Sequence, residues 1–196
     1  MQTETTPDRI VLAALELVLS QGVKRTNLAE VAFRAGVTRV TVYRYFGDKR
    51  GLVQAVCMWI AAIFQRAADE GPAASVHDVD LRLNRLGAEL GALPPGKLLA
   101  RLEEIHRLYP EVYAEFVLAR QIAVDRIFQQ ALAAATCDGT LRDGLNLDVL
   151  KAIFWAAVIG LMENPALISS NVALADVFAT VTELFRHGIL KNPGGV

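Results

Sequence analysis

The stretch of the chain from residue 28 to residue 52 restricts the possible folds more than any other stretch does. It reads LAEVAFRAGVTRVTVYRYFGDKRGL. Leu28 and Val31 have helical spacing, so the first part of the stretch is expected to be a helix with one buried side. Gly36 would end this helix, and Thr38 would cap a second one with its hydroxyl. A helix, a tight turn and a second short helix are typical of a helix-turn-helix.

The second helix of this motif carries more polar and aromatic side chains than a helix that only packs against a core. They are Arg39, Thr41, Tyr43, Arg44 and Tyr45. In helix-turn-helix proteins this helix enters the major groove of DNA. Arginine can donate two hydrogen bonds to guanine, and threonine or valine methyls can meet the thymine methyl. Tyrosine, lysine and helix N-terminal N–H groups suit phosphate oxygens, so we expect a double-stranded DNA operator as partner.

The charge pattern agrees with DNA binding. The whole chain has a net charge of −1, which hides a local excess. Residues 24–50 contain seven basic and two acidic residues, a net charge of +5, whereas the segments on both sides are acidic. A compact basic segment is typical of phosphate binding. By itself it could also be a solvated basic face without a partner, but the helix-turn-helix spacing favours DNA.

The composition predicts an all-α fold, because strand-like alternation is scarce and prolines separate the periodic apolar segments. Hydrophobic residues make up 53% of the 196 residues, enough for a large core. We expect nine helices, over about residues 7–21, 28–35, 39–45, 49–68, 76–93, 97–109, 111–136, 147–163 and 174–190. The expected domains are a helix-turn-helix DNA-binding domain over residues 1–50 and a second helical domain over residues 51–196, for which the family resemblance given below implies effector binding and dimerisation.

The sequence favours a soluble cytoplasmic protein without a membrane partner. The first six residues lack the basic and apolar regions of a signal peptide. The longest apolar run, Ala152 to Met162, has 11 residues, too few to span a bilayer. Cys57 and Cys137 lie in apolar helical surroundings outside any CxxC pair, and we expect two reduced thiols.

Catalysis is not expected. The three histidines, His77, His106 and His187, are far apart and form neither an HxxxH nor an HxxE pattern. There is no glycine-rich phosphate loop. We therefore predict no catalytic residues, no metal and no cofactor. A helical enzyme is the less favoured alternative, and a constitutive or activating DNA-binding protein without an effector is the other one.

The helix-turn-helix stretch also resembles a known family. The Ala35-Gly36-Val37 turn, the Tyr43-x-x-Phe46 pair and Asp48-Lys49 before Leu52 occur together at the spacing of the TetR family of bacterial transcriptional regulators. The resemblance covers about residues 8–55, and the remaining sequence fits the family in layout only. It implies a nine-helix architecture with an N-terminal three-helix domain and a C-terminal ligand-sensing and dimerisation domain.

The resemblance implies roles for individual residues of the motif. Arg39, Val40, Thr41 and Arg44 match positions that face base edges, with Tyr45 as a weaker candidate beside them. Tyr43 matches a phosphate-contacting tyrosine. Lys49 matches a lysine that holds the DNA backbone together with the helix N-terminus. Thr26 and Thr38 match capping positions that also touch phosphate.

Two C-terminal helices predict a homodimer. The helix over about residues 147–163 is apolar nearly all round, so it needs cover on both sides. The predicted interface residues are Ala152, Ala156, Gly160, Val177, Phe178, Val181, Leu184 and Phe185. A purely intramolecular core is the alternative. A symmetric dimer would present two recognition helices roughly 34 Å apart and read a palindrome.

The sequence suggests a small hydrophobic or aromatic effector, because the candidate lining residues are mostly apolar. They are Trp59, Ile63, Phe64, Leu102, Ile105, His106, Tyr109, Tyr113, Phe116, Arg120 and Trp155. Taken singly, each of them fits a core position better than a ligand contact, and His106, Tyr109, Tyr113 and Arg120 are the polar groups that could orient a ligand. Effector binding is expected to shift the fourth helix and lower operator affinity.

Overall fold

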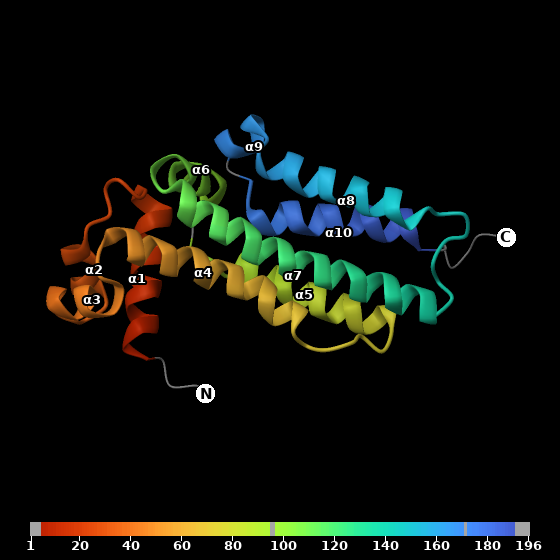
Figure 1. Cartoon of the computed structure of the whole chain (residues 1–196), viewed down its shortest axis with the longest axis horizontal. Coiled ribbons are helices and arrows are strands. Elements are labelled where there is room, and N and C mark those ends of the chain that lie inside the picture. Colours follow the sequence, from red (N-terminus) through yellow and green to blue (C-terminus); the bar gives the residue numbers. More distant parts are fainter. Residues whose placement is uncertain (1–4, 95–96, 171, 191–196) are drawn as a thin grey trace. The chain divides into compact units, whose positions relative to one another are not determined.

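A computed structural model of the chain describes residues 5–94, 97–170 and 172–190 (Figure 1). The helices are α1 (Thr6–Gln21), α2 (Leu28–Arg34), α3 (Arg39–Phe46), α4 (Lys49–Ala68), α5 (Val76–Gly91), α6 (Leu98–Leu108), α7 (Pro110–Cys137), α8 (Leu147–Met162), α9 (Pro165–Ser169) and α10 (Leu174–Ile189). In these ranges one isolated bridge, between Leu141 and Leu190, is the extent of β-structure. The all-α prediction is confirmed.

The nine expected helices correspond to α1–α8 and α10. The additional helix, α9, has five residues and begins at Pro165, after Asn164 has capped it by accepting from Ala166 N at 2.9 Å. The sequence pattern did not separate it because five residues are too few to show a periodic apolar face.

The chain forms two compact units, and each contains two separate stretches of sequence. The first unit contains Met1–Ala62 and Leu93–Gln121, and the second contains Ile63–Ala92 and Ile122–Val196. The boundary between them falls inside α4 and inside α7. These two helices therefore contribute residues to both units.

In the first unit, local caps define the N-terminal helices. Thr5 and Asp8 form a capping box at α1, where the Thr5 N–H donates to the Asp8 carboxylate at 3.0 Å. Asn27 accepts from the Glu30 N–H at 2.9 Å to begin α2, and Thr38 accepts from the Thr41 N–H at 3.1 Å to begin α3. α2 packs against both α1 and α3. The helix-turn-helix is therefore specified by short-range hydrogen bonds.

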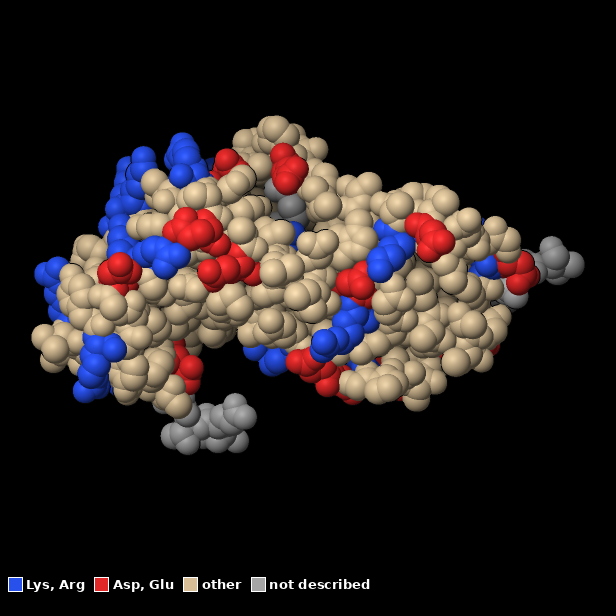
Figure 2. All heavy atoms as spheres, viewed as in Figure 1, with Lys and Arg blue, Asp and Glu red and all other residues tan. Residues whose placement is uncertain are grey.

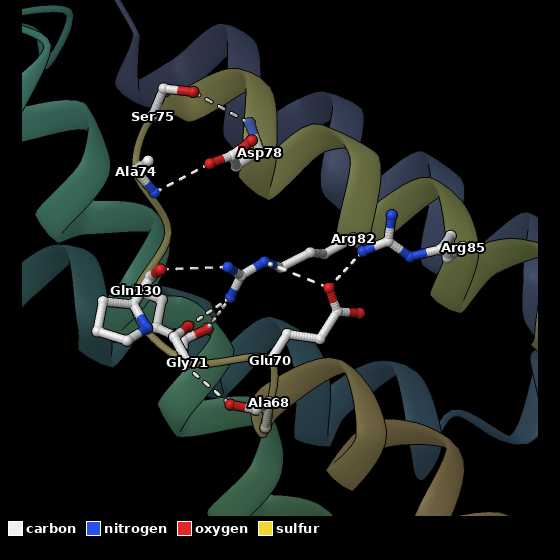
Figure 3. Close-up of polar contacts among 10 residues, drawn as sticks. Ala68, Glu70, Gly71, Ala74, Ser75, Asp78, Arg82, Arg85 and Gln130 are labelled. Atoms are coloured by element: carbon white, nitrogen blue, oxygen red, sulfur yellow. Dashed lines mark hydrogen bonds and ion pairs between the residues drawn. The ribbon is translucent and has the colours of Figure 1, made fainter.

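In the second unit, Arg82 of α5 holds the loop that follows α4 (Figure 3). Its guanidinium donates to the carbonyls of Gly71 and Pro72 at 2.5 and 3.2 Å, and to Gln130 of α7 at 3.3 Å. It also pairs with Glu70 at 3.6 Å, and the side chain is 12% exposed. One largely buried cation thus ties the α4–α5 loop to α5 and α7.

The second unit also has its own apolar core. Phe128, Leu132, Leu150 and Ile189 are buried in it. The rings of Phe128 and Phe154 stack at 4.4 Å, and the ring of Phe185 meets Phe154 edge-on at 5.1 Å. α8 and α10 therefore each turn one side toward this core.

Two segments are long and apolar enough to cross a bilayer by length and composition, namely Lys49–Ala68 and Leu147–Ser169. The first is more than half buried, as the core helix of a soluble protein is. In the second, the most apolar part is not buried by the described part of the chain, although Leu150 near its start is buried in the core. Ile153 and Ile159 of α8 are accordingly exposed.

Candidate nucleic-acid interface and effector site

The helix α3 presents almost all of its side chains to solvent. Val42 is the one residue of the helix that is buried. Val40 is 76% exposed, Arg39, Tyr43, Arg44 and Tyr45 are exposed, and Thr41 is half-buried. A helix that is anchored by one side chain and exposes arginine, tyrosine and valine is suited to enter a groove.

The two arginines of α3 are each held by a neighbouring tyrosine. The Arg39 guanidinium donates to the Tyr43 hydroxyl at 2.9 Å and lies 5.3 Å from the centre of its ring. The Arg44 guanidinium lies 5.1 Å from the centre of the Tyr45 ring. Such contacts restrict the rotamers of the arginines, while most of the five N–H donors of each remain available for a base or a phosphate.

The predicted threonines are placed differently. The hydroxyls of Thr38 and Thr41 lie 2.9 Å apart at the exposed start of α3. Thr26 is 4% exposed, and its hydroxyl donates to the Gly22 carbonyl at 2.8 Å. The side chain of Thr26 therefore stabilises the turn after α1, and Asn27 supplies the cap of α2.

Lys49, at the first position of α4, contacts the connection between α1 and α2. Its ammonium donates to the Lys24 carbonyl at 3.1 Å. Burial lowers the pKa of Lys49, and the negative charge of Glu104 partly opposes this. The ammonium keeps two further N–H donors, enough to reach a phosphate while it anchors the connection between α1 and α2.

Basic side chains gather on the part of the first unit that carries the motif. Figure 2 shows them over α3 and the connection between α1 and α2. Lys24, Arg25, Arg39 and Arg44 are exposed there. Arg34 is exposed too, but it pairs with Glu16 at 3.8 Å and Glu30 at 3.5 Å, so part of its charge is already balanced. This distribution suits a polyanion.

One residue that the sequence interpretation missed is Phe33 of α2, which is 86% exposed. The signal was present, because Leu28, Val31, Ala32 and Ala35 are the buried side of this helix and residue 33 falls on the opposite side. The helix-turn-helix therefore has an exposed phenylalanine on α2.

A second missed feature joins α6 to the end of α1. The Glu104 carboxylate accepts from the N–H groups of Val23 and Lys24 at 3.2 and 3.0 Å. Arg101 donates to the carbonyls of Leu19 and Ser20, both at 3.4 Å, and its guanidinium lies 3.4 Å from Glu104. We call these two side chains the Arg101–Glu104 clasp.

The clasp also restricts the type of residue that can occupy position 22, between α1 and α2. Gly22 has a φ of 93°, and a Cβ there would lie 2.7 Å from the Glu104 carboxylate. A side chain at this position would be strained by the positive φ and would push the ends of the Glu104 and Arg101 side chains aside. The clasp satisfies carbonyls that the end of a helix leaves open, so it caps α1 from a distant element.

Eight of the predicted effector residues lie in the first unit. Leu102, Ile105, Phe116 and Arg120 are buried, Trp59, Tyr109 and Tyr113 are half-buried, and His106 is exposed. The His106 and Tyr113 rings stack at 4.4 Å, and the Tyr113 and Phe116 ring centres are 6.3 Å apart. The Arg120 guanidinium lies 5.6 Å from the Phe116 ring centre. These four residues form one aromatic column that ends at a cation.

The other three predicted effector residues lie in the second unit. Ile63 and Phe64 are buried. Trp155 is half-buried and donates from its ring nitrogen to Asp125 at 3.3 Å, and Asp125 also pairs with Lys151 at 2.8 Å. The indole of Trp155 thus already has a hydrogen-bond acceptor within its own unit.

The predicted dimer residues divide between two sides of the second unit. Ala152, Ala156 and Gly160 are exposed, and so is Leu184, at 68%. Val177 and Val181 are half-buried, on the same side of α10 as Leu184 by helical spacing. Phe178 lies against Gly87 of α5, and Phe185 packs against the core of this unit. These two phenylalanines stabilise the unit itself.

Among the residues whose placement is described, no group of three or more His, Cys, Asp or Glu is arranged to hold a metal ion.

Comparison with known proteins identifies relatives of the N-terminal region. The family model for "Bacterial regulatory proteins, tetR family" matches residues 10–56. This range contains α2 and α3 and most of α1. The HTH-type transcriptional regulator SrpR of Pseudomonas putida is 27% identical over 176 residues, which cover 82% of this chain and 75% of SrpR.

The structural similarity to solved proteins covers nearly the whole chain. SmeT, the repressor of the Stenotrophomonas maltophilia multidrug efflux pump SmeDEF, superposes with a TM-score of 0.63 at 21% identity, over 98% of this chain and 94% of SmeT. Its triclosan complex gives 0.61 at 22% identity, over 97% and 94%. A transcriptional regulator from Saccharomonospora viridis in complex with choline gives 0.65 at 19% identity, over 95% and 98%. At these identities the likeness concerns the fold.

Proposed function

We propose that this chain, which belongs to the TetR family of bacterial regulatory proteins, is a repressor that binds a palindromic operator as a homodimer and is released by a small hydrophobic effector. As a member of this family it is a helix-turn-helix transcriptional regulator. The observation that carries the proposal is the exposed recognition helix α3, with arginine and tyrosine side chains paired on its surface. The proposed site of action is the cytoplasm.

In this proposal the domain over residues 1–50 reads DNA. Arg39 and Arg44 donate to guanine edges, with Val40 and Thr41 beside them, and Tyr43 and Tyr45 position the two guanidinium groups. Lys49, the N-terminus of α4 and Thr38 contact phosphates. Thr26 supports the turn from inside and has no direct contact.

The domain over residues 51–196 pairs with a second copy. The exposed apolar side of α8, with Ala152, Ala156 and Gly160, allows close approach of a symmetry-related helix. Val177, Val181 and Leu184 of α10 complete the interface. Burial of this apolar surface is the driving force, at roughly 25 cal/mol for each Å².

Release by an effector is supported by SmeT, a repressor whose structure has been solved in complex with triclosan. In this chain the Arg101–Glu104 clasp offers a route from the effector domain to DNA. A ligand that displaces α6 would move the end of α1 and hence the helix-turn-helix. The effector therefore shifts the population toward a form that fits the operator poorly.

Selection of genomic fragments by the purified protein tests the proposal. We expect enrichment of one short inverted repeat, which binding measurements with wild type and two variants then examine. Arg44→Ala should relax base preference, with a cost of about 1–3 kcal/mol on the selected sequence only. Lys49→Ala should weaken all sequences similarly and reduce the salt dependence.

The control is Arg66→Ala, which removes an exposed arginine of α4 paired with Glu89 in the second unit. It should bind like wild type. The proposal is wrong if no repeat is enriched, or if the Arg44 and Lys49 variants bind every sequence as the Arg66 variant does.

A further inference from the structure

The buried guanidinium of Arg120 is the most unusual charged group of the first unit. Arg120 lies on α7 and is 7% exposed. Its Nε atom is buried without a hydrogen-bond partner. The neighbours that the structure places by it are aromatic, namely the Phe116 ring at 5.6 Å and the phenol of Tyr113. Burial lowers the pKa of Arg120, and Tyr113 partly opposes this.

Other shielded arginines of this protein are neutralised. Arg82 has the Glu70 carboxylate at 3.6 Å, Arg101 has Glu104 at 3.4 Å, and Arg186 has Asp80 at 2.9 Å. For Arg120, the described residues provide no such carboxylate within ion-pair distance. A charge buried without a counterion is costly, so it is expected where a bound partner supplies the counterion.

The side chains beside Arg120 define the rest of such a partner. His106, Tyr113 and Phe116 form a continuous aromatic column, and Phe116 is the ring that the guanidinium overlies. An aromatic body would pack on these rings, and an attached oxyanion such as a carboxylate or sulfonate could accept two parallel hydrogen bonds from the guanidinium.

We propose that Arg120 binds the anionic group of the effector, and that the effector is an aromatic acid with a single negative charge. This inference rests on the proposed function, because it assigns a chemical class to the effector of that function. It narrows the expected ligand from a small hydrophobic or aromatic molecule to an aromatic anion.

The position of Arg120 connects ligand binding to DNA release. Its aromatic column includes His106, which α6 carries two residues after Glu104 of the clasp. Because Arg120 is buried, a ligand can reach it only if the surrounding side chains or helices move. An anion that enters beside Arg120 and separates the column acts on the helix that holds the end of α1.

Two dyes with one aromatic skeleton test the inference. 1-Anilinonaphthalene-8-sulfonate carries one negative charge, and N-phenyl-1-naphthylamine lacks the sulfonate. Fluorescence titration of the full-length protein should show saturable binding of the anion, about tenfold or more tighter than binding of the neutral dye.

Variants test whether Arg120 is the residue that causes the preference for the anionic dye. Arg120→Gln should weaken the anion about tenfold or more and leave the neutral dye within about twofold. Arg120→Lys keeps the charge and should retain part of the preference; it also serves where the glutamine variant does not fold. Arg107→Gln removes an exposed arginine of α6 and is the control, with binding of both dyes as in wild type.

Equal affinities for the two dyes overturn the inference, and so does anion binding by Arg120→Gln equal to that of Arg107→Gln. Absence of saturable binding of the anion up to on the order of 1 mM overturns it as well. Fragment selection without any dye reports on the proposed function separately. An enriched repeat with no charge preference leaves the repressor proposal standing and rejects the anionic effector alone.

Discussion

Replacing Glu104 by glutamine tests whether the clasp holds α6 to the end of α1. The carboxylate is 13% exposed and accepts from the N–H groups of Val23 and Lys24 at 3.2 and 3.0 Å. Glutamine has the same shape but only one acceptor oxygen, and that oxygen is neutral. One of these hydrogen bonds is therefore lost, and the other is made to an uncharged acceptor.

The magnitude follows from the surroundings of the two donors. A hydrogen bond to a charged group contributes about 1.5–3 kcal/mol, and a neutral one about 0.5–1.5 kcal/mol. The Lys24 N–H lies at the surface, where water replaces the lost acceptor, while Val23 is fully buried. We therefore expect Glu104→Gln to lower the free energy of unfolding by about 1.5–3 kcal/mol.

Urea unfolding measures this change as a lower midpoint with an unchanged slope. The matched control is Glu103→Gln on the same helix, where the carboxylate is 57% exposed and its neighbour His106 lies 3.9 Å away. This control should stay within about 0.5 kcal/mol of wild type. If the two variants unfold at the same urea concentration, the clasp contributes no stability and the reasoning fails.

Three further substitutions and one thiol titration have defined outcomes. Gly51→Ala places a Cβ 2.1 Å from the carbonyl oxygen that ends α3, so it should cost about 1–3 kcal/mol in urea unfolding and weaken operator binding. Gly188→Ala, with nothing within 4 Å, should be neutral or stabilising. In thiol titration of the native protein the exposed Cys137 should react and Cys57 should not, because burial raises the pKa of Cys57 to about 12; a second thiol reacting at the same rate contradicts its burial. Asp8→Ala should lower the free energy of unfolding by about 1 kcal/mol at pH 7. Hydrogen bonds from the preceding cap residue lower the pKa of Asp8 below 3.8, so this contribution is present above that pH and disappears as the pH falls further; a constant difference down to pH 2 rejects it.

The sequence was sufficient for the N-terminal helices because their signals are local. Asn27, Thr38 and Asp48 each bond to a backbone N–H three residues ahead, within the window that capping patterns describe. The exposed arginines and tyrosines of α3 follow from the same local spacing. Thr26 shows the limit, because pattern alone did not tell a cap from a buried hydroxyl.

Features that depend on distant pairing were out of reach. Glu104 and Lys24 are 80 residues apart, and no sequence pattern indicates that side chains of α6 cap the end of α1. The burial of Arg120 likewise depends on how α6 and α7 pack. The apolar pattern of α10 identified Phe185 and Leu184 as hydrophobic positions. Which of them is in the core depends on the neighbouring helices: Phe185 packs against the core and Leu184 is exposed.

The helix α6 is where these long-range features meet. It carries Arg101 and Glu104, which hold the end of α1, and His106, which stacks on Tyr113 of the column that ends at Arg120. Eleven residues form a rigid rod of three turns, so a displacement imposed at one side is passed to the other. An effector beside Arg120 therefore needs no contact with α2 or α3 to change their fit to DNA. It needs only to make the arrangement of α6 that releases α1 more favourable than the arrangement that holds it.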